Sequence, residues 1–191
     1  MFVLGLITAR GGSKRIPRKN VKILGKVPLV AWTISAGSQS QSLDGLVVST
    51  EDQEIVEISR SWGAEVLRRP NELATDTASS YDVMKHALDS TIRPVDFLCL
   101  LQPTSPFRTN VDIDQCVSLA TRHYMPVVAA QWGRNVPNGS IYVAPTSWIR
   151  DGGNFDGPGP LYYWMPPERS MDLDTPEDWE RAEQMISAWS E

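Results

Sequence analysis

The chain has 191 residues, of which 41% are apolar and 21% are charged, and its net charge is −5. This is the composition of an ordinary globular protein with one compact domain. The negative charge disfavours a general nucleic-acid binder, and no apolar run approaches the roughly 20 residues that cross a bilayer. The apolar opening lacks the features of a signal peptide, and only two cysteines are present. We therefore expect a cytoplasmic protein without nucleic-acid or membrane partners.

Charge is distributed unevenly along the chain. Residues 1–43 contain no Asp or Glu, whereas the rest of the chain holds the other 11 of the 18 basic side chains and all 23 acidic ones. The basic side chains of this first segment are Arg10, Lys14, Arg15, Arg18, Lys19, Lys22 and Lys26. Such an asymmetry concentrates positive potential in one place on an acidic molecule and predicts an anionic ligand there.

Strands and helices alternate in the first half of the chain. The predicted elements, in order, are a buried strand at 2–8, a helix at 29–40, a strand at 45–49, a helix at 52–62 and a strand at 65–67. The strands are short runs rich in Val, Ile and Leu, and the helices carry apolar residues at helical spacing. Pro28 suits the start of the first helix, and Gly63 suits the end of the second.

The second half continues the alternation. Its predicted elements are a helix at 80–89, a strand at 96–101, a helix at 111–122, strands at 127–130 and 140–143, and a helix at 176–188. The predicted N-cap residues are Thr77 or Ser79 for the first of these helices, Asn110 for the second and Thr175 for the last. The Gly- and Pro-rich segment 151–160 predicts a mobile loop that either covers a site or connects elements on the surface.

This order of elements predicts the fold class. A single α/β domain over residues 1–191 is expected, with three layers (α/β/α), a mostly parallel sheet and right-handed crossovers. Ligands of such sheets bind outside the carboxyl ends of the strands. The loops expected at that edge are 9–20, 68–79 and 102–109.

Residues 9–20, read ARGGSKRIPRKN and called the basic loop below, directly follow the first predicted strand. Gly11 and Gly12 let the backbone approach a bulky anion and present N–H groups to it. Arg10, Lys14 and Lys19 can neutralise a polyphosphate from several directions. Neither GxxxxGK[ST] nor GxGxxG is present. The residues alone favour phosphate binding over a solvated basic loop, without deciding between them.

Five segments, in order, carry a family resemblance. They follow the basic loop, which shares the resemblance, and they are VVSTEDQEI from Val47, RRPNELATDTASS from Arg68, LLQPTSPFRT from Leu100, PNGSIYV from Pro137 and RSMDLDTPED from Arg169. The chain resembles the acylneuraminate cytidylyltransferases (CMP-sialic acid synthetases), which are related to CMP-Kdo synthetases and, more widely, to sugar-nucleotide transferases. The resemblance implies a Rossmann-like nucleotide-diphospho-sugar transferase fold.

The resemblance also implies the nucleotide contacts. The triphosphate and ribose would be bound by Arg10, Gly11, Ser13, Lys14, Lys19 and Asn20. Cytosine would lie against the loop that holds Arg69, Ala78 and Ser80. A capping role for the DTASS stretch is compatible with this assignment.

For the acceptor sugar, the family pattern points to Gln102, Asn138 and Tyr142. On the residues alone, Gln102 could instead bond backbone, PNG is a turn signal, and Tyr142 could be a half-buried strand residue.

Asp172 and Asp174 lie two residues apart, a spacing that in extended backbone projects both carboxylates to one side. This arrangement suits Mg²⁺, which prefers carboxylates and substrate phosphates as ligands, and the resemblance implies such a metal site. Alone, two acids before a helix start could simply favour the helix dipole.

The implied reaction is transfer of CMP from CTP to an acidic sugar of the 2-keto-3-deoxy class, with release of pyrophosphate. Arg10, Lys14, Lys19 and Asp174 would be the catalytic residues, acting through positioning and charge neutralisation. The sequence indicates no general base. The alternatives are a guanylyl- or uridylyltransferase for a sugar phosphate, and a non-catalytic paralogue that binds nucleotide.

The chain departs from the family near residues 131–137, where the dimerisation and sugar-binding insertion is largely missing. Val136 stands where the family has an arginine for the sugar carboxylate, and Arg134 is a candidate to replace it. A homodimer is therefore less firmly expected, and we expect an unusual acceptor, either another 2-keto-3-deoxy sugar acid or a smaller acid.

Overall fold

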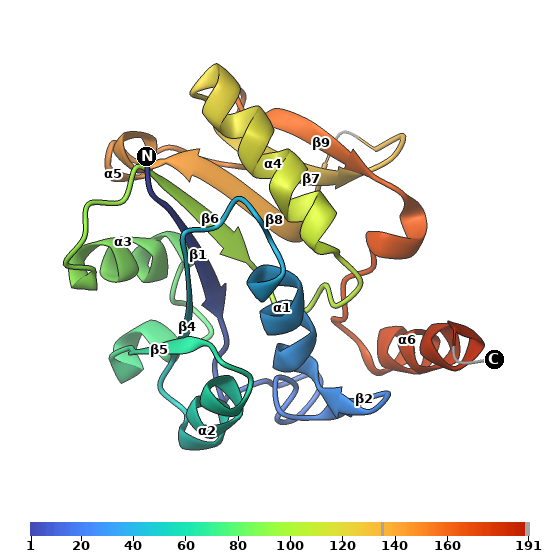
Figure 1. Ribbon diagram of the computed structural model, residues 1–191. Helices are drawn as coiled ribbons and strands as arrows, with labels where there is room; N and C mark the ends of the chain where they lie inside the picture. Colours follow the sequence, from blue (N-terminus) through green and yellow to red (C-terminus); the bar gives the residue numbers. More distant parts are fainter. Residues whose placement is uncertain (135, 190–191) are drawn as a thin grey trace.

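The computed structural model describes residues 1–134 and 136–189, and it is built on one seven-stranded sheet (Figure 1). The strand order is β5-β4-β1-β6-β8-β7-β9. The strands are β1 (Val3–Thr8), β4 (Gly45–Thr50), β5 (Glu65–Arg68), β6 (Phe97–Leu101), β7 (Val127–Gln131), β8 (Pro137–Pro145) and β9 (Leu161–Met165). All of the pairings are parallel except those of β8 with β6 and with β7. The predicted mostly parallel sheet is confirmed.

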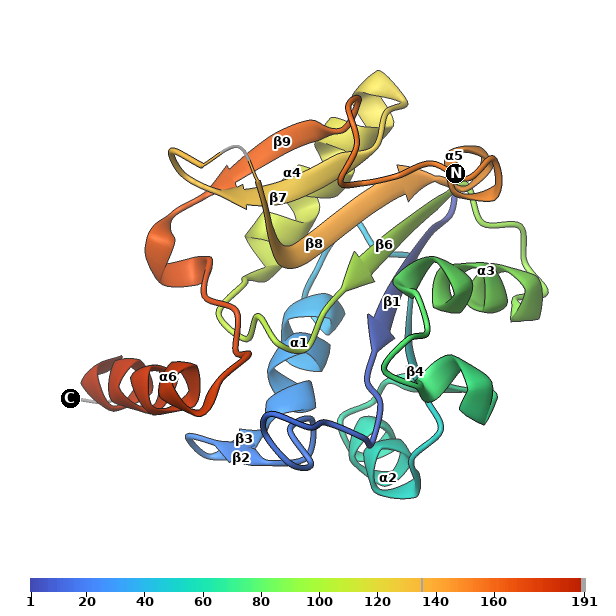
Figure 2. The ribbon, with the colours of Figure 1, turned by 180° about the vertical axis from the view of Figure 1, so that it is seen from behind.

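Helices cover both faces of this sheet. They are α1 (Leu29–Ser38), α2 (Gln53–Ser61), α3 (Ser80–Ser90), α4 (Asn110–His123), α5 (Thr146–Arg150) and α6 (Pro176–Trp189), and short 3₁₀ turns occupy Asn71–Ala74 and Pro167–Arg169. Helices α1, α2 and α4 pack on one face, and α3 and α5 pack on the other. Figures 1 and 2 show these two layers from opposite sides. The predicted three-layer structure is confirmed.

The alternating direction of strand side chains fills both cores. In β6, Phe97, Cys99 and Leu101 enter the core beneath α1 and α4, whereas Leu98 and Leu100 enter the core beneath α3. A parallel strand that is covered on both sides reads as a continuous apolar run. This is why the sequence pattern marked β6 so clearly.

Helix α6 lies beside the sheet, next to the small hairpin formed by β2 (Ile23–Leu24) and β3 (Val27–Pro28) (Figure 1). Trp179 of α6 packs into a separate apolar cluster with Ile16 of the basic loop and Leu24 of the hairpin. The Nζ atom of Lys22 also lies 4.2 Å from the centre of the Trp179 ring. The C-terminal helix therefore stabilises the basic loop through apolar packing.

One predicted cap is wrong. Thr109, not Asn110, is the N-cap of α4, because its Oγ accepts from the N–H of Asp112 while the Asp112 carboxylate accepts from the N–H of Thr109. This reciprocal arrangement satisfies two N–H groups at once, and Asn110 instead becomes the first helical residue. Ser79, rather than Thr77, caps α3, and Thr175 Oγ accepts from the N–H of Asp178 at the start of α6, as predicted.

Several elements were not predicted: the hairpin β2–β3, helix α5 and strand β9. Strand β8 is also longer than the predicted 140–143. The segment 151–160 is held against the sheet by Phe155, which is buried and whose N–H donates to the hydroxyl of Tyr81. Phe155 also packs on Tyr142. None of the helices in the described part of the chain combines the length and apolar character needed to span a membrane.

Candidate active site

A pocket of about 360 Å³ lies at the carboxyl ends of β1 and β6, where the three loops expected at this edge meet. Its lining residues include the predicted acceptor residue Gln102 and most of the predicted nucleotide and metal residues, namely Arg10, Ser13, Lys19, Asn20, Arg69, Ala78, Ser80, Asp172 and Asp174. These residues come from four separate stretches of sequence. The fold therefore brings together the basic loop, the Arg69–Ser80 loop and the Asp172–Asp174 segment.

The basic loop is fixed to the sheet through its backbone. The N–H of Gly11 donates to Oε1 of Glu51 at 2.7 Å, and a Cβ at Gly11 would lie only 2.4 Å from Oδ2 of Asp52. Asn20 is buried and donates from Nδ2 to the carbonyl of Arg10 at 2.8 Å. Gly12, rather than Gly11, lines the pocket. A side chain at position 11 would therefore collide with Asp52, so glycine lets the basic loop lie close to the end of β4. The hydrogen bond from Asn20 holds the two ends of the loop together.

Each predicted phosphate-binding cation contacts an acid. Arg10 and Lys14 both contact Asp76. Lys19 donates from Nζ to the carbonyl of Leu173 at 2.6 Å and lies 3.4 Å from Oδ1 of Asp174. Lys14 does not line the pocket; its side chain is 83% exposed and reaches Asp76 from outside. Positive groups therefore converge from several directions on one cavity, as anion binding requires.

The predicted cytosine-binding side of the pocket contains a buried arginine. The Arg69 side chain is buried, and its Nε lies 3.3 Å from Oε2 of Glu51. Burial lowers the pKa of the Arg69 guanidinium, although Glu51 opposes that shift. The same Glu51 carboxylate accepts from Gly11. Glu51 thus connects the basic loop to the Arg69–Ser80 loop, and sequence reasoning did not identify it.

Asp172 and Asp174 both line the pocket, as their spacing predicted. Burial raises the pKa of the Asp172 carboxyl, and the nearby Asp174 adds to the shift. The buried Oδ1 of Asp172 has no hydrogen-bond partner within the described residues. A cation that takes both carboxylates and completes its shell with phosphate oxygens and water fits these groups. Across residues 1–134 and 136–189, no cluster of three or more His, Cys, Asp or Glu offers an all-protein metal site.

A second cavity of about 400 Å³ adjoins the first and shares Gln102 and Asp172 with it. Arg134, Asn138 and Tyr142 line this second cavity. The three predicted acceptor residues, Gln102, Asn138 and Tyr142, therefore line one cavity, next to the predicted metal carboxylates. The family insertion is predicted to be missing from the turn between β7 and β8, in which Asn135 lies outside the described residues.

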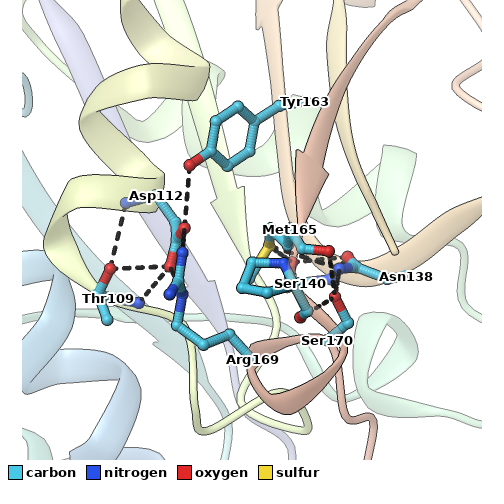
Figure 3. Close-up of polar contacts among 9 residues, drawn as sticks. Thr109, Asp112, Asn138, Ser140, Tyr163, Met165, Arg169 and Ser170 are labelled. Carbon is cyan, nitrogen blue, oxygen red and sulfur yellow. Dashed lines mark hydrogen bonds and ion pairs between the residues drawn. The ribbon is translucent and has the colours of Figure 1, made fainter. Parts of the chain in front are cut away.

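Asn138 uses its side chain to hold the cavity wall (Figure 3). Its Oδ1 accepts from the N–H and the hydroxyl of Ser140, at 3.1 and 2.6 Å. Its Nδ2 donates to Ser170 Oγ at 3.1 Å and to the Met165 sulfur at 3.4 Å. Both ends of the amide are therefore engaged within the protein. This geometry favours a positioning role for Asn138 over direct sugar contact.

A buried ion pair holds the chain just before Asp172 (Figure 3). Asp112 is fully buried and accepts from Nε and Nη2 of Arg169, each at 3.0 Å. The hydroxyl of Tyr163 donates to the same carboxylate at 3.0 Å. Burial acts to raise the pKa of Asp112, but the bonds from Arg169 and Thr109 outweigh it and hold that pKa below its usual value. This network was not predicted, because Tyr163 lies in a strand that the sequence pattern missed.

Arg108 holds the backbone of Gln102, which lines both cavities. The Arg108 guanidinium is buried, donates to Thr33 Oγ at 2.7 Å and donates to the carbonyl of Gln102. Burial lowers the pKa of Arg108 to about 10. The QPTSPFR segment contains this arginine, but sequence reasoning assigned it no role. A charged residue six positions after Gln102 would have been the available signal.

Comparisons with known proteins agree with this geometry. Residues 4–129 match a family model described as cytidylyltransferase. The chain is 35% identical to an N-acylneuraminate cytidylyltransferase of Escherichia coli over 94% of its own length, but it spans only about half (51%) of that relative. It is 32% identical to a CMP-N,N'-diacetyllegionaminic acid synthase of Legionella pneumophila, with 97% of each chain covered.

The fold has a solved counterpart. A structure of CMP:2-keto-3-deoxy-manno-octonic acid synthetase complexed with CTP superimposes with a TM-score of 0.82, covering 99% of this chain and all of that one, at 13% identity. The alignment with the Legionella relative spans 228 positions, more than the 191 residues of this chain. The chain therefore lacks residues that the relative has. It belongs to the cytidylyltransferase family and is a shortened member, with N-acylneuraminate cytidylyltransferases among its relatives.

Proposed function

We propose that the protein transfers CMP from CTP to a 2-keto-3-deoxy sugar acid, sialic-acid-like or related, and releases pyrophosphate. The observation that carries the proposal is that one pocket is lined both by the cations Arg10 and Lys19 and by the carboxylates of Asp172 and Asp174. A site with both cationic groups and a carboxylate pair matches a polyphosphate with a divalent cation. Family membership supports the choice of CTP as the nucleotide.

In this proposal the nucleotide occupies the first cavity. Arg10, Lys14 and Lys19 bind the triphosphate, and the loop with Arg69, Ala78 and Ser80 binds cytosine. Asn20 braces the basic loop, and Ser13 lines the pocket beside it. Selection of a pyrimidine over a purine would require this loop to form a slot too narrow for the larger ring.

The acceptor occupies the second cavity, beside Gln102 and Tyr142, with Arg134 facing its carboxylate. Its anomeric hydroxyl oxygen bonds to the α-phosphorus in line, while the bond from that phosphorus to the pyrophosphate oxygen breaks. The hydroxyl proton passes to solvent water. Arg10, Lys14 and Lys19 stabilise the charge that develops on the phosphate oxygens.

Asp172 and Asp174 would hold Mg²⁺, which supplies further neutralisation of phosphate charge when bound. The half-buried Asp172 lines both cavities, and the exposed Asp174 lines the first one. A cation held by these carboxylates would lie in the first cavity, next to the second. A homodimer, which the family resemblance suggested, remains a prediction that light scattering of the purified chain would test.

The decisive experiment measures pyrophosphate release with each of the four nucleoside triphosphates against a panel of sugar acids, with and without Mg²⁺. We expect turnover with CTP only, and only with Mg²⁺ present. A preference for GTP or UTP with a sugar phosphate would instead indicate a guanylyl- or uridylyltransferase. Rapid turnover with N-acetylneuraminate would contradict the expectation of an unusual acceptor.

A matched pair of variants tests the metal assignment. Asp174→Asn should lower turnover by roughly 100-fold or more, the scale of losing one group that stabilises transition-state charge. Glu177→Gln removes a charge from the exposed first turn of α6, three residues away, and should leave turnover within about two-fold. Equal activity of the two variants would refute the role of Asp174.

A further inference from the structure

Asp76 bridges two cations at the mouth of the first cavity. Its Oδ1 lies 2.7 Å from Nη1 of Arg10, and its Oδ2 lies 2.5 Å from Nζ of Lys14. The hydrogen bond from Lys14, and then that from Arg10, lower the pKa of the Asp76 carboxyl. The carboxylate is therefore ionised and shared between the two cations.

Asp76 reaches these cations from the opposite wall. It lies between the 3₁₀ turn Asn71–Ala74 and the start of α3, whereas Arg10 and Lys14 belong to the basic loop. Asp76 and Arg10 line the same cavity. The negative oxygens of Asp76 thus occupy the space between two groups that a phosphate would contact. An ionised carboxylate offers acceptor oxygens only, which is also what a phosphate offers.

The other cations of this cavity have acid partners too. Lys19 lies near Asp174, and Arg69 pairs with Glu51. The Arg69 and Glu51 side chains are only 4% and 17% exposed, whereas the Asp76 side chain is 41% exposed. Exposed ion pairs are weak because water screens them. An entering polyphosphate therefore displaces the bridge made by Asp76 more easily than the Arg69–Glu51 pair, since the polyphosphate brings more charge and more oxygens than one carboxylate.

We infer that Asp76 is a displaceable counter-ion that sets the affinity of this cavity for phosphate groups. It keeps Arg10 and Lys14 together when no nucleotide is bound, and it competes with phosphate for both. The competition weakens the binding of every phosphate ligand, and it speeds the departure of pyrophosphate. The inference rests on the proposed function, because it takes the cavity to be the triphosphate site.

A role for Asp76 in positioning Arg10 predicts the opposite change in phosphate affinity. If Asp76 only positioned Arg10, removal of its charge would loosen the arginine and weaken phosphate binding. If Asp76 competes with phosphate, removal of its charge frees two cations and tightens binding. The sign of a single affinity change therefore separates the two roles.

The experiment compares wild type, Asp76→Asn and Asp76→Ala by isothermal titration calorimetry with inorganic tripolyphosphate, in buffer without divalent cations. We expect both variants to bind tripolyphosphate about three- to ten-fold more tightly, the scale of freeing two exposed ion pairs. Glu72→Gln removes a charge from the neighbouring 3₁₀ turn and should change this affinity by less than about two-fold. Unchanged or weaker binding in the two Asp76 variants would overturn the inference.

Turnover separates this inference from the proposed function. If no nucleotide is turned over but the Asp76 variants bind tripolyphosphate more tightly, the counter-ion role stands and the proposed reaction falls. If CTP is turned over but the variants bind tripolyphosphate no more tightly than wild type, the reaction stands and the counter-ion role falls. Absence of tripolyphosphate binding in all forms would also overturn the inference.

Discussion

Arg169→Met tests the buried ion pair that precedes the Asp172 carboxylate. The substitution keeps most of the side-chain length and removes the charge, so the fully buried Asp112 loses both bonds from the guanidinium. Breaking a buried pair in this way costs about 3–5 kcal/mol. Arg169 is one-third exposed and Asp112 keeps the bonds from Thr109 and Tyr163. We therefore expect Arg169→Met to lower the free energy of unfolding by about 2–3 kcal/mol, which at most reaches the lower limit of that range.

The assay is urea unfolding followed by tryptophan fluorescence, with the free energy of unfolding extrapolated linearly to zero denaturant. The matched control is Arg150→Met, which breaks the exposed pair of Arg150 with Asp89. That control should cost less than about 1 kcal/mol, because exposed pairs are screened by water. If Arg169→Met costs no more than Arg150→Met, the reasoning about the buried pair is wrong.

Two further predictions concern acid stability and acceptor binding. The pKa of Asp112 is lowered in the folded state, so its contribution to stability is present above the ordinary Asp pKa of about 3.9 and is lost as the pH falls through the folded value. Acid unfolding curves of Asp112→Asn should therefore fall less steeply below about pH 4 than those of wild type; an equal slope would refute this linkage. Arg134→Ala should raise the acceptor KM by roughly 10- to 100-fold, the scale of one lost charge-assisted bond, while the KM for CTP stays within two-fold, because Arg134 lines only the second cavity of the two. Steady-state kinetics with each substrate varied in turn would measure both, with Arg122→Ala on the exposed surface of α4 as the control.

Local patterns were sufficient for the central strands and for most helices. Strands β1, β4 and β6 are short runs of β-branched and apolar residues, and burial on both faces imposes that composition. Strand β9 was missed because its aromatic residues are mostly half-exposed, and because its place is decided by parallel pairing with β7, about 34 residues earlier. Such pairing leaves no signal in the strand's own sequence.

The N-cap of α4 is a second case in which local sequence leaves a choice that a distant contact decides. Thr109 and Asn110 are both good N-cap residues, so the sequence does not choose between them. The choice falls to Asp112, whose carboxylate must be buried beside Arg169 and also bonds the N–H and hydroxyl of Thr109. A contact 57 residues away therefore decides where the helix begins.

The sequence by itself determined most of the chemical groups that line the site, although not Glu51, which supports two of its loops. The basic loop, the Asp172–Asp174 pair and the family segments are short stretches whose residue types can be read directly. Only the tertiary structure decided how those groups are paired: Arg10 and Lys14 with Asp76, Arg69 with Glu51, and Asn138 with Ser170. The physical reason is that electrostatic and hydrogen-bond energies depend on the distance between atoms and on their burial. For residues far apart in the chain, both are set by the packing of the sheet and its helices.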